Sequence, residues 1–219
     1  MNPARFLFFV VSLLMGCQTK AADRVGPLSS AGHLTATHQL IRPAGQSVEF
    51  GGRPVDLVAS PDGRTLYVKD NRGLVVIDAA TWRIRQEFKF NGGGGSVHGM
   101  AVTRDGSRIY ATTPQDILWE ITTTPSGKVE RGRKLVLPGP GGKGDPVLAG
   151  LALSADEKTA YVCLSRNNSL GILDLASGKL VGQVPVGVAP YDVVLVAEGK
   201  KAFVSNWGGR HPRQGERTA

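Results

Sequence analysis

The chain has 219 residues, 41% hydrophobic and 20% charged, a composition that favours a globular protein over a disordered one. The 29 glycines and 13 prolines, with only 6% aromatic residues, favour many short strands joined by tight turns over long helices. The net charge is +8, but the basic residues are scattered through predicted turns, so nucleic acid is not expected as a partner.

An export signal is predicted at residues 1–16. Arg5 precedes an apolar run over residues 6–15, which is too short for the roughly twenty residues of a membrane-spanning helix. The sequence Leu-Met-Gly-Cys that ends at Cys17 resembles the bacterial lipoprotein box. This resemblance implies that Cys17 carries a lipid and that the chain is anchored to a membrane on the periplasmic side of the cell envelope.

Residues 17–36 follow the lipoprotein box and are small and polar without periodicity, so we interpret them as the lipidated N-terminus and a flexible linker. A folded region is expected from residue 37 to residue 209, followed by a basic tail at 210–219. The only other cysteine, Cys163, lies in a predicted core strand, where a lone thiol usually serves as a small hydrophobic residue.

An internal repeat defines the folded region. Residues 55–68, 98–111, 149–162 and 191–204 superpose without a gap, at periods of 43, 51 and 42 residues. The longest period contains a predicted loop insertion over residues 138–146. Each copy has an acid in its turn and an aromatic residue shortly after it: Asp62 and Tyr67, Asp105 and Tyr110, Asp156 and Tyr161, Glu198 and Phe203.

Each repeat reads as a set of short strands. Strands are expected at 55–59, 65–69, 74–78 and 83–90 in the first copy, at 117–121 and 128–136 in the second, at 170–175 and 180–186 in the third, and at 191–196 and 200–206 in the fourth. Four antiparallel strands every 40 to 50 residues are typical of propeller blades. A β-sandwich is the alternative, but it has no reason to place the same acid and aromatic residue in every unit.

The sequence therefore predicts an all-β fold, an incomplete β-propeller of about three and a half four-stranded blades. Residues 46–50 could supply a strand that completes the last blade. Because so few blades cannot close a ring that normally has four to eight, we expect the chain to be the front part of a longer protein.

The second strands carry a family resemblance. Residues 66–69, 160–163 and 202–205 resemble the YVTN-type β-propeller repeat, and the likeness extends over roughly residues 50–209. The lipoprotein box, residues 39–45 and residues 205–210 further resemble bacterial lipoproteins in which such a propeller precedes an alkaline-phosphatase-like phosphoesterase domain. This resemblance implies that any phosphoesterase site lies outside this chain.

One set of polar residues is expected at the channel mouth, where the innermost strands begin. Asp56 and Asp192 occupy equivalent repeat positions, and with the nearby His98 and Arg53 they could form a pocket for an anion, a metal or a peptide. Alternatively, the two acids accept hydrogen bonds from neighbouring backbone and fix the start of each blade. The sequence contains no zinc-binding pattern, P-loop or nucleophile elbow, so we expect no catalytic residue, metal or cofactor.

Two classes of function remain. The first is a non-catalytic, lipid-anchored propeller that binds a protein or small-molecule ligand, or scaffolds a further domain. The alternative is part of an enzyme, either a lactonase-type hydrolase that uses channel-mouth acids and a metal, or a propeller–phosphoesterase fusion whose catalytic domain is absent here.

Overall fold

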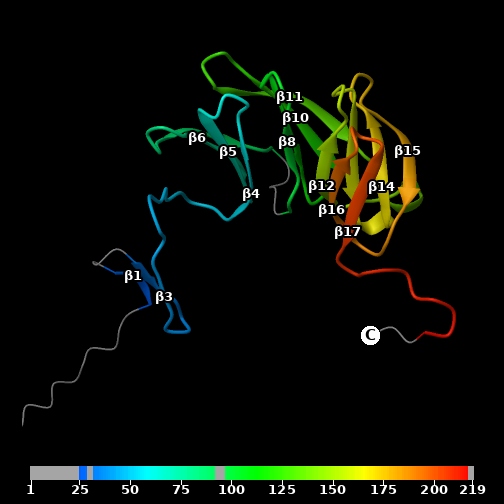
Figure 1. Cartoon of the computed structure of the whole chain (residues 1–219), viewed down its shortest axis with the longest axis horizontal. Coiled ribbons are helices and arrows are strands. Elements are labelled where there is room, and N and C mark those ends of the chain that lie inside the picture. The colour runs from blue at the N-terminus through cyan, green and yellow to red at the C-terminus, as the bar shows by residue number, and fades with distance from the viewer. Residues whose placement is uncertain (1–24, 29–31, 92–96, 217–219) are drawn as a thin grey trace, which may run out of the picture. The chain divides into compact units, whose positions relative to one another are not determined.

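The computed structural model describes residues 25–28, 32–91 and 97–216 (Figure 1). The expected export signal and Cys17 lie outside these residues. The chain divides into two compact units, Met1–Gln46 and Ser47–Ala219. Among the described residues, no helix is long and apolar enough to cross a membrane.

The first unit contains a small antiparallel sheet of three strands: β1 (Gly26–Leu28), β2 (Gly32–Leu34) and β3 (Leu40–Ile41). The linker expected over residues 17–36 is therefore not structureless throughout. Leu34 is 7% exposed, so one apolar side chain of this segment is buried. Strands of two or three residues are too short to produce a periodic pattern, which is why sequence periodicity did not reveal them.

The second unit consists of three four-stranded sheets and one two-stranded sheet, and every pair of neighbouring strands is antiparallel. We call the sheets blades 1 to 4. Blade 1 is β4 (Pro54–Ala59), β5 (Thr65–Asp70), β6 (Gly73–Asp78) and β7 (Ile84–Lys89). Blade 2 is β8 (Met100–Val102), β9 (Arg108–Thr112), β10 (Ile117–Thr123) and β11 (Val129–Val136). Blade 3 is β12 (Leu148–Leu153), β13 (Thr159–Leu164), β14 (Ser169–Asp174) and β15 (Lys179–Pro185), and blade 4 is β16 (Pro190–Val196) and β17 (Lys201–Asn206).

These sheets confirm the all-β propeller fold. The strand order within each blade follows the chain, and the first strands of successive blades contact one another. The loop expected at 138–146 contains the short 3-10 helix η1 (Pro140–Gly142), and a second one, η2 (Ser165–Asn167), joins β13 to β14.

The repeated turn acids hold the turns between the first two strands of the blades. Asp62 accepts hydrogen bonds from the Ser60 hydroxyl (2.6 Å) and from the Arg64 N–H (3.0 Å). Asp105 and Asp156 repeat this arrangement in blades 2 and 3. A side-chain acceptor at this position satisfies turn N–H groups that the strand ladder leaves unpaired.

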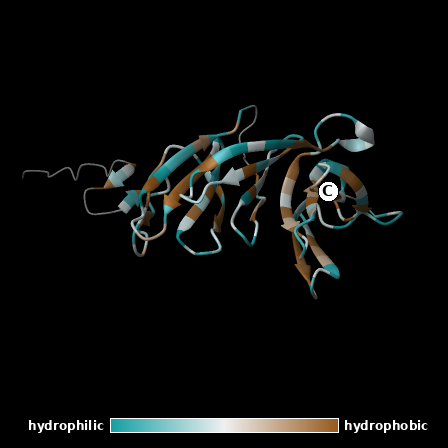
Figure 2. Cartoon of the chain, turned by 90° about the horizontal axis from the view of Figure 1, so that it is seen from above, coloured by the Kyte–Doolittle hydropathy of each residue, from teal (hydrophilic) through white to brown (hydrophobic). Residues whose placement is uncertain are grey.

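Apolar side chains from facing sheets form the core. Figure 2 shows that hydrophobic residues concentrate in the strands, whereas the connecting turns are mostly hydrophilic. Between blades 1 and 2, the cluster includes Tyr67, Val76, Ile109 and Trp119, all at most 3% exposed. A second cluster between blades 2 and 3 contains Tyr110, Leu118, Leu148, Val162 and Leu173. Burial of both faces of blade 2 explains why its strands are apolar on both sides.

Blade 4 differs from the others because one of its faces is open. Its repeat aromatic residue, Phe203, is 64% exposed, whereas Tyr67 and Tyr110 are 3% and 2% exposed.

Residues 46–50, the segment that could complete the last blade, do not do so. Val48 and Phe50 form no strand and instead pack against Val68 and Val75 of blade 1, because that face would otherwise be an uncovered apolar surface.

A pair of leucine substitutions tests this stack of sheets. Leu118→Ala should lower the free energy of unfolding by about 2–5 kcal/mol, because Leu118 is fully buried between two sheets. Leu57→Ala, the matched control at a site 56% exposed, should change it by no more than about 0.5 kcal/mol. Chemical denaturation of both variants measures the difference, and equal losses would contradict the arrangement of the sheets.

Candidate functional site

Three of the four residues expected at the channel mouth come together. His98 lies between two carboxylates: its Nδ1 is 3.2 Å from Asp56 Oδ2, and its Nε2 is 3.2 Å from Asp192 Oδ1. Asp56 belongs to β4 in blade 1, His98 lies two residues before β8 in blade 2, and Asp192 belongs to β16 in blade 4. We call these three residues the histidine bridge. It connects three blades through one imidazole ring.

The two acids favour the protonated form of His98. The hydrogen bond to Asp56 raises the pKa of His98 above 6.5, and the charge of Asp192 adds to this effect although partial burial opposes it. Burial raises the pKa of Asp56, but the contact with His98 and the Gly99 N–H outweigh it, so the pKa of Asp56 is lowered. An imidazolium between two carboxylates is therefore the favoured state at mildly acidic pH.

The same carboxylates also bond to backbone, as the structural alternative expects. Asp56 accepts hydrogen bonds from the N–H groups of Leu57 (2.8 Å) and Gly99 (2.9 Å), and Gly99 belongs to the next blade. Asp192 accepts one from the Val193 N–H at 2.8 Å. The acids thus fix the starts of the inner strands and hold His98 at the same time.

The fourth expected residue, Arg53, is not part of this contact set. It lies just before β4 and is exposed, and its backbone N–H donates a hydrogen bond to Asn71 Oδ1 at 2.9 Å. Within the described part of the chain, the Arg53 side chain forms no ion pair. Its proposed role in ligand binding stays a prediction.

A buried lysine lies beneath the histidine bridge and was missed by the sequence reasoning. Lys69, on β5, is fully buried and donates hydrogen bonds to the Gly99 carbonyl oxygen and to Thr112 Oγ1, each at 3.0 Å. Burial lowers its pKa to about 7, although the charge of Asp56 opposes this shift. The available signal was the repeat itself, since Lys69 takes the place that the buried Cys163 has in blade 3.

Cys163 is fully buried in β13, as the sequence predicts. Burial raises the pKa of its thiol to about 12, and the charge of Asp192 contributes to the shift. The thiol is therefore protonated at neutral pH and cannot act as a nucleophile or as a ready metal ligand.

Aromatic rings extend the site outward. The His98 ring stacks on Tyr191 with centroids 5.8 Å apart, and Tyr191 stacks on Trp207 at 5.0 Å. Trp207 is 82% exposed, so most of this large apolar ring faces solvent. We call His98, Tyr191 and Trp207 the aromatic stack. An exposed ring held in place by a second ring is a preorganised surface for stacking against a ligand or a partner side chain.

Metal binding has little support in this geometry. Among residues 25–28, 32–91 and 97–216, no group of three His, Cys, Asp or Glu side chains is arranged to hold a metal ion. In the histidine bridge, both ring nitrogens already face carboxylate oxygens. A metal would have to displace one of these contacts.

Comparison with known proteins supports the fold. No protein-family model matches the chain, and no curated protein is similar to it at a significant level. Among solved structures, the periplasmic gluconolactonase PpgL of Pseudomonas aeruginosa has a TM-score of 0.61 at 21% identity, over 81% of this chain and 56% of that one.

Two further structures give the same result. The hydrazine synthase of Kuenenia stuttgartiensis has a TM-score of 0.59 at 22% identity, over 75% of this chain and 46% of its own. The β-propeller domain of Cps50 (Swd1) from Myceliophteria thermophila has a TM-score of 0.52 at 18% identity, over 64% of this chain and 43% of its own. The chain thus spans about half the length of these structures, and the likeness shows a β-propeller fold rather than a shared activity.

The histidine bridge predicts a pH-dependent contribution to stability. Because the pKa of His98 is raised above 6.5, its stabilising effect should be complete below that pH and be lost as pH rises through the folded-state pKa. His98→Gln should therefore be less stable than the wild type by roughly 1 kcal/mol in mild acid, and by less at alkaline pH. Denaturation at a series of pH values measures this difference.

Lys69 also makes stability depend on pH, but it is present in the wild type and in every variant. Its contribution therefore cancels when each variant is compared with the wild type. The lowered pKa of Lys69 has the opposite sign, since it makes stability increase as pH rises from about 7 towards 10.5. His33→Gln, at an exposed position on β2, is the matched control and should show no such trend. A pH-independent difference for His98→Gln would show that the bridge is not ionic.

Proposed function

We propose that the chain is an exported, lipid-anchored β-propeller module that binds a partner or small ligand at the aromatic stack and does not catalyse a reaction there. The observation that supports this proposal most directly is the engagement of both His98 ring nitrogens by carboxylates, at 3.2 Å each. A general base needs a free ring nitrogen directed at the substrate. In this site, the ring instead holds three blades together.

The surface beside the bridge is suited to binding. Trp207 and Tyr191 offer aromatic faces, and the Asp192 side chain is 47% exposed, so it can accept a hydrogen bond from a ligand beside the rings. A rigid aromatic anchor with a charged group at its edge is typical of the residues that contribute most to binding energy. The lipid at Cys17 would present this surface on the periplasmic side of a membrane.

The proposal extends to the whole protein. The YVTN-type repeat and the resemblance to propeller–phosphoesterase lipoproteins support a role in which the propeller binds and positions a partner for a catalytic domain. In that case, the phosphoesterase chemistry belongs to the further domain, and the present chain supplies recognition and membrane attachment.

A lactonase-type hydrolase is the second candidate. Two similar solved structures are described as a periplasmic gluconolactonase and a putative 6-phosphogluconolactonase, the latter with a TM-score of 0.58 at 16% identity. The two acids of the histidine bridge would then have to hold a metal or activate water. Their present contacts with His98 and with backbone N–H groups oppose this role.

Site-specific photo-crosslinking in cells tests the binding surface. A photoreactive amino acid in place of Trp207 should give a discrete crosslinked product, because this ring is the most exposed part of the aromatic stack. The same residue in place of Trp82, which is 42% exposed in blade 1, is the matched control and should give none. Equal crosslinking at both positions would contradict a specific surface.

A lactone assay separates the two candidates. With glucono-1,5-lactone and 6-phosphogluconolactone as substrates, the binding proposal expects hydrolysis at the uncatalysed rate with or without added metal. Faster hydrolysis that is lost in the Asp56→Ala and Asp192→Ala double variant would establish the lactonase. Cooperative unfolding of the double variant is the check that it still folds.

Membrane attachment is tested by Cys17→Ser. The wild-type chain, expressed with its own leader in a bacterium, should incorporate radiolabelled palmitate and sediment with membranes. Cys17→Ser should lose both properties, whereas Cys163→Ser should keep them because that thiol is buried in the core. Labelling that persists in Cys17→Ser would contradict the lipoprotein assignment.

A further inference from the structure

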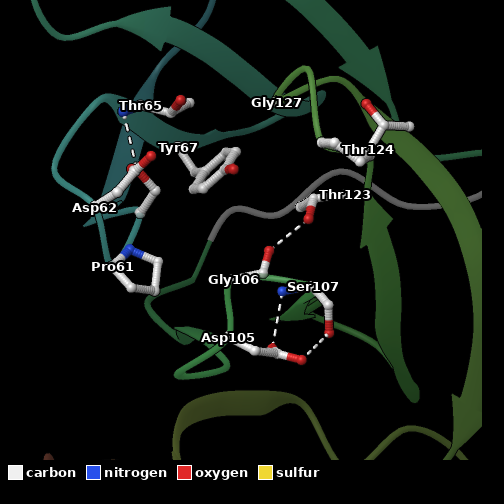
Figure 3. A pocket seen from close by; sticks show the side chains of 12 residues that line it. Pro61, Asp62, Thr65, Tyr67, Asp105, Gly106, Ser107, Thr123, Thr124 and Gly127 are labelled. Atoms are coloured by element: carbon white, nitrogen blue, oxygen red, sulfur yellow. Dashed lines mark hydrogen bonds between the residues drawn. The ribbon is translucent and has the colours of Figure 1, made fainter.

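A second candidate binding site lies away from the histidine bridge, between blades 1 and 2. It is a cavity of about 340 Å³ bordered by the β4–β5 turn of blade 1 and by the β8–β9 and β10–β11 turns of blade 2 (Figure 3). Its size falls in the range of small-molecule sites. Hydroxyl and carboxylate groups lie around the cavity, and Pro61, Pro125 and the Tyr67 ring supply its apolar surface.

The Tyr67 hydroxyl is the donor that the cavity offers to a ligand. Tyr67 is 3% exposed and lines the cavity, yet within the described part of the chain its hydroxyl has no hydrogen-bond partner. Burial raises the pKa of this hydroxyl, with Asp62 adding to the shift, so it stays protonated and can donate. Because this hydroxyl borders the cavity, it is open to a hydroxyl oxygen of a bound ligand, which can take the place of water there.

The next gap between blades shows what such a partner looks like. There, the equivalent residue Tyr110 donates to Glu120 Oε2 at 3.0 Å, and Glu120 pairs with Arg133 at 2.6 Å. On the neighbouring strand of each blade, Glu120 is the register partner of Tyr110, whereas Val76 is the register partner of Tyr67. The chain thus supplies an acceptor for Tyr110 but places an apolar side chain where Tyr67 would need one.

The charges around the cavity select against an anion. A hydrogen bond from Ser60 lowers the pKa of Asp62, and one from Thr103 lowers the pKa of Asp105. Both carboxylates are therefore ionised at neutral pH. The nearby Arg85 is already paired with Asp78. Arg64 and Arg108 act on these carboxylates but do not line the cavity, so a negatively charged ligand inside it would meet the two carboxylates first.

The cavity also offers few free oxygen ligands for a cation. Both oxygens of Asp105 accept hydrogen bonds from their own turn, and Asp62 Oδ1 accepts two more. Most of the lining hydroxyls donate within their own blades and keep lone pairs that can accept, so together with the Tyr67 hydroxyl as a donor they suit a neutral ligand that both donates and accepts hydrogen bonds. A sugar ring meets these requirements, because its C–H face can also lie against the tyrosine ring and the prolines.

We propose that the cavity between blades 1 and 2 binds a neutral polyhydroxylated ligand of monosaccharide size, one of whose hydroxyl oxygens accepts the hydrogen bond of Tyr67. This site is independent of the aromatic stack and of the function proposed for it. It gives the chain a second recognition surface, on the turns that carry the repeated acids Asp62 and Asp105.

The test uses amide NMR spectra of the Cys17→Ser chain titrated with glucose, galactose, mannose and myo-inositol, and with gluconate as the anionic comparison. At least one neutral compound should shift the amides of Gly63, Gly106 and Gly127 at millimolar concentration, and gluconate should not. Tyr67→Phe should weaken that binding about 5-fold, as expected for one lost hydrogen bond. Tyr110→Phe, whose hydroxyl is already engaged, should leave the affinity unchanged.

Several outcomes would overturn the proposal. These are an absence of shifts at the three glycines with every neutral compound, tighter binding of gluconate, or an unchanged affinity in Tyr67→Phe. Binding that disappears in Trp207→Ala but persists in Tyr67→Phe would assign the ligand to the aromatic stack instead. The wild-type shift map decides the location even if a variant fails to fold.

Discussion

The close approach of the inner strands is the constraint on which this structure depends. A Cβ atom at Gly99 would lie 2.1 Å from the Ala149 carbonyl oxygen, and one at Gly150 would lie 2.6 Å from the Cα atom of Asp192. Only glycine fits where neighbouring backbones come this near. The absence of a side chain at Gly99 also leaves its N–H accessible to Asp56 of the preceding blade, so the same residue that permits close packing completes the contact between blades.

The repeat explains how a uniform scaffold acquires different chemistry in each gap. Equivalent positions on the second strands hold Lys69, Thr112, Cys163 and Ser205. The first two bond to each other across blades 1 and 2, the third fills an apolar cluster, and the fourth accepts a hydrogen bond from the Asp192 N–H. Backbone geometry places these side chains alike, and single substitutions then decide whether a gap is polar, apolar or open.

Much of the fold could be predicted from the sequence, because strand alternation, turn acids and repeat spacing are local patterns. The meeting of Asp56, His98 and Asp192 followed partly from their repeat positions, since propeller strands begin near a common axis. Lys69 and the unpartnered hydroxyl of Tyr67 did not follow, because both depend on which side chain the facing blade presents. The same limit applies to residues 46–50, whose apolar pattern suited either a strand or a cover for blade 1.

The burial of Cys163 has a practical consequence for labelling this chain. The sequence holds two cysteines, and a Cys17→Ser chain retains only a thiol with no exposed surface. A maleimide dye requires an accessible thiolate, so it will react with a cysteine introduced at a solvent-facing position and leave β13 untouched. Fluorescent probes for distance measurements between the two compact units can therefore be attached without altering the core.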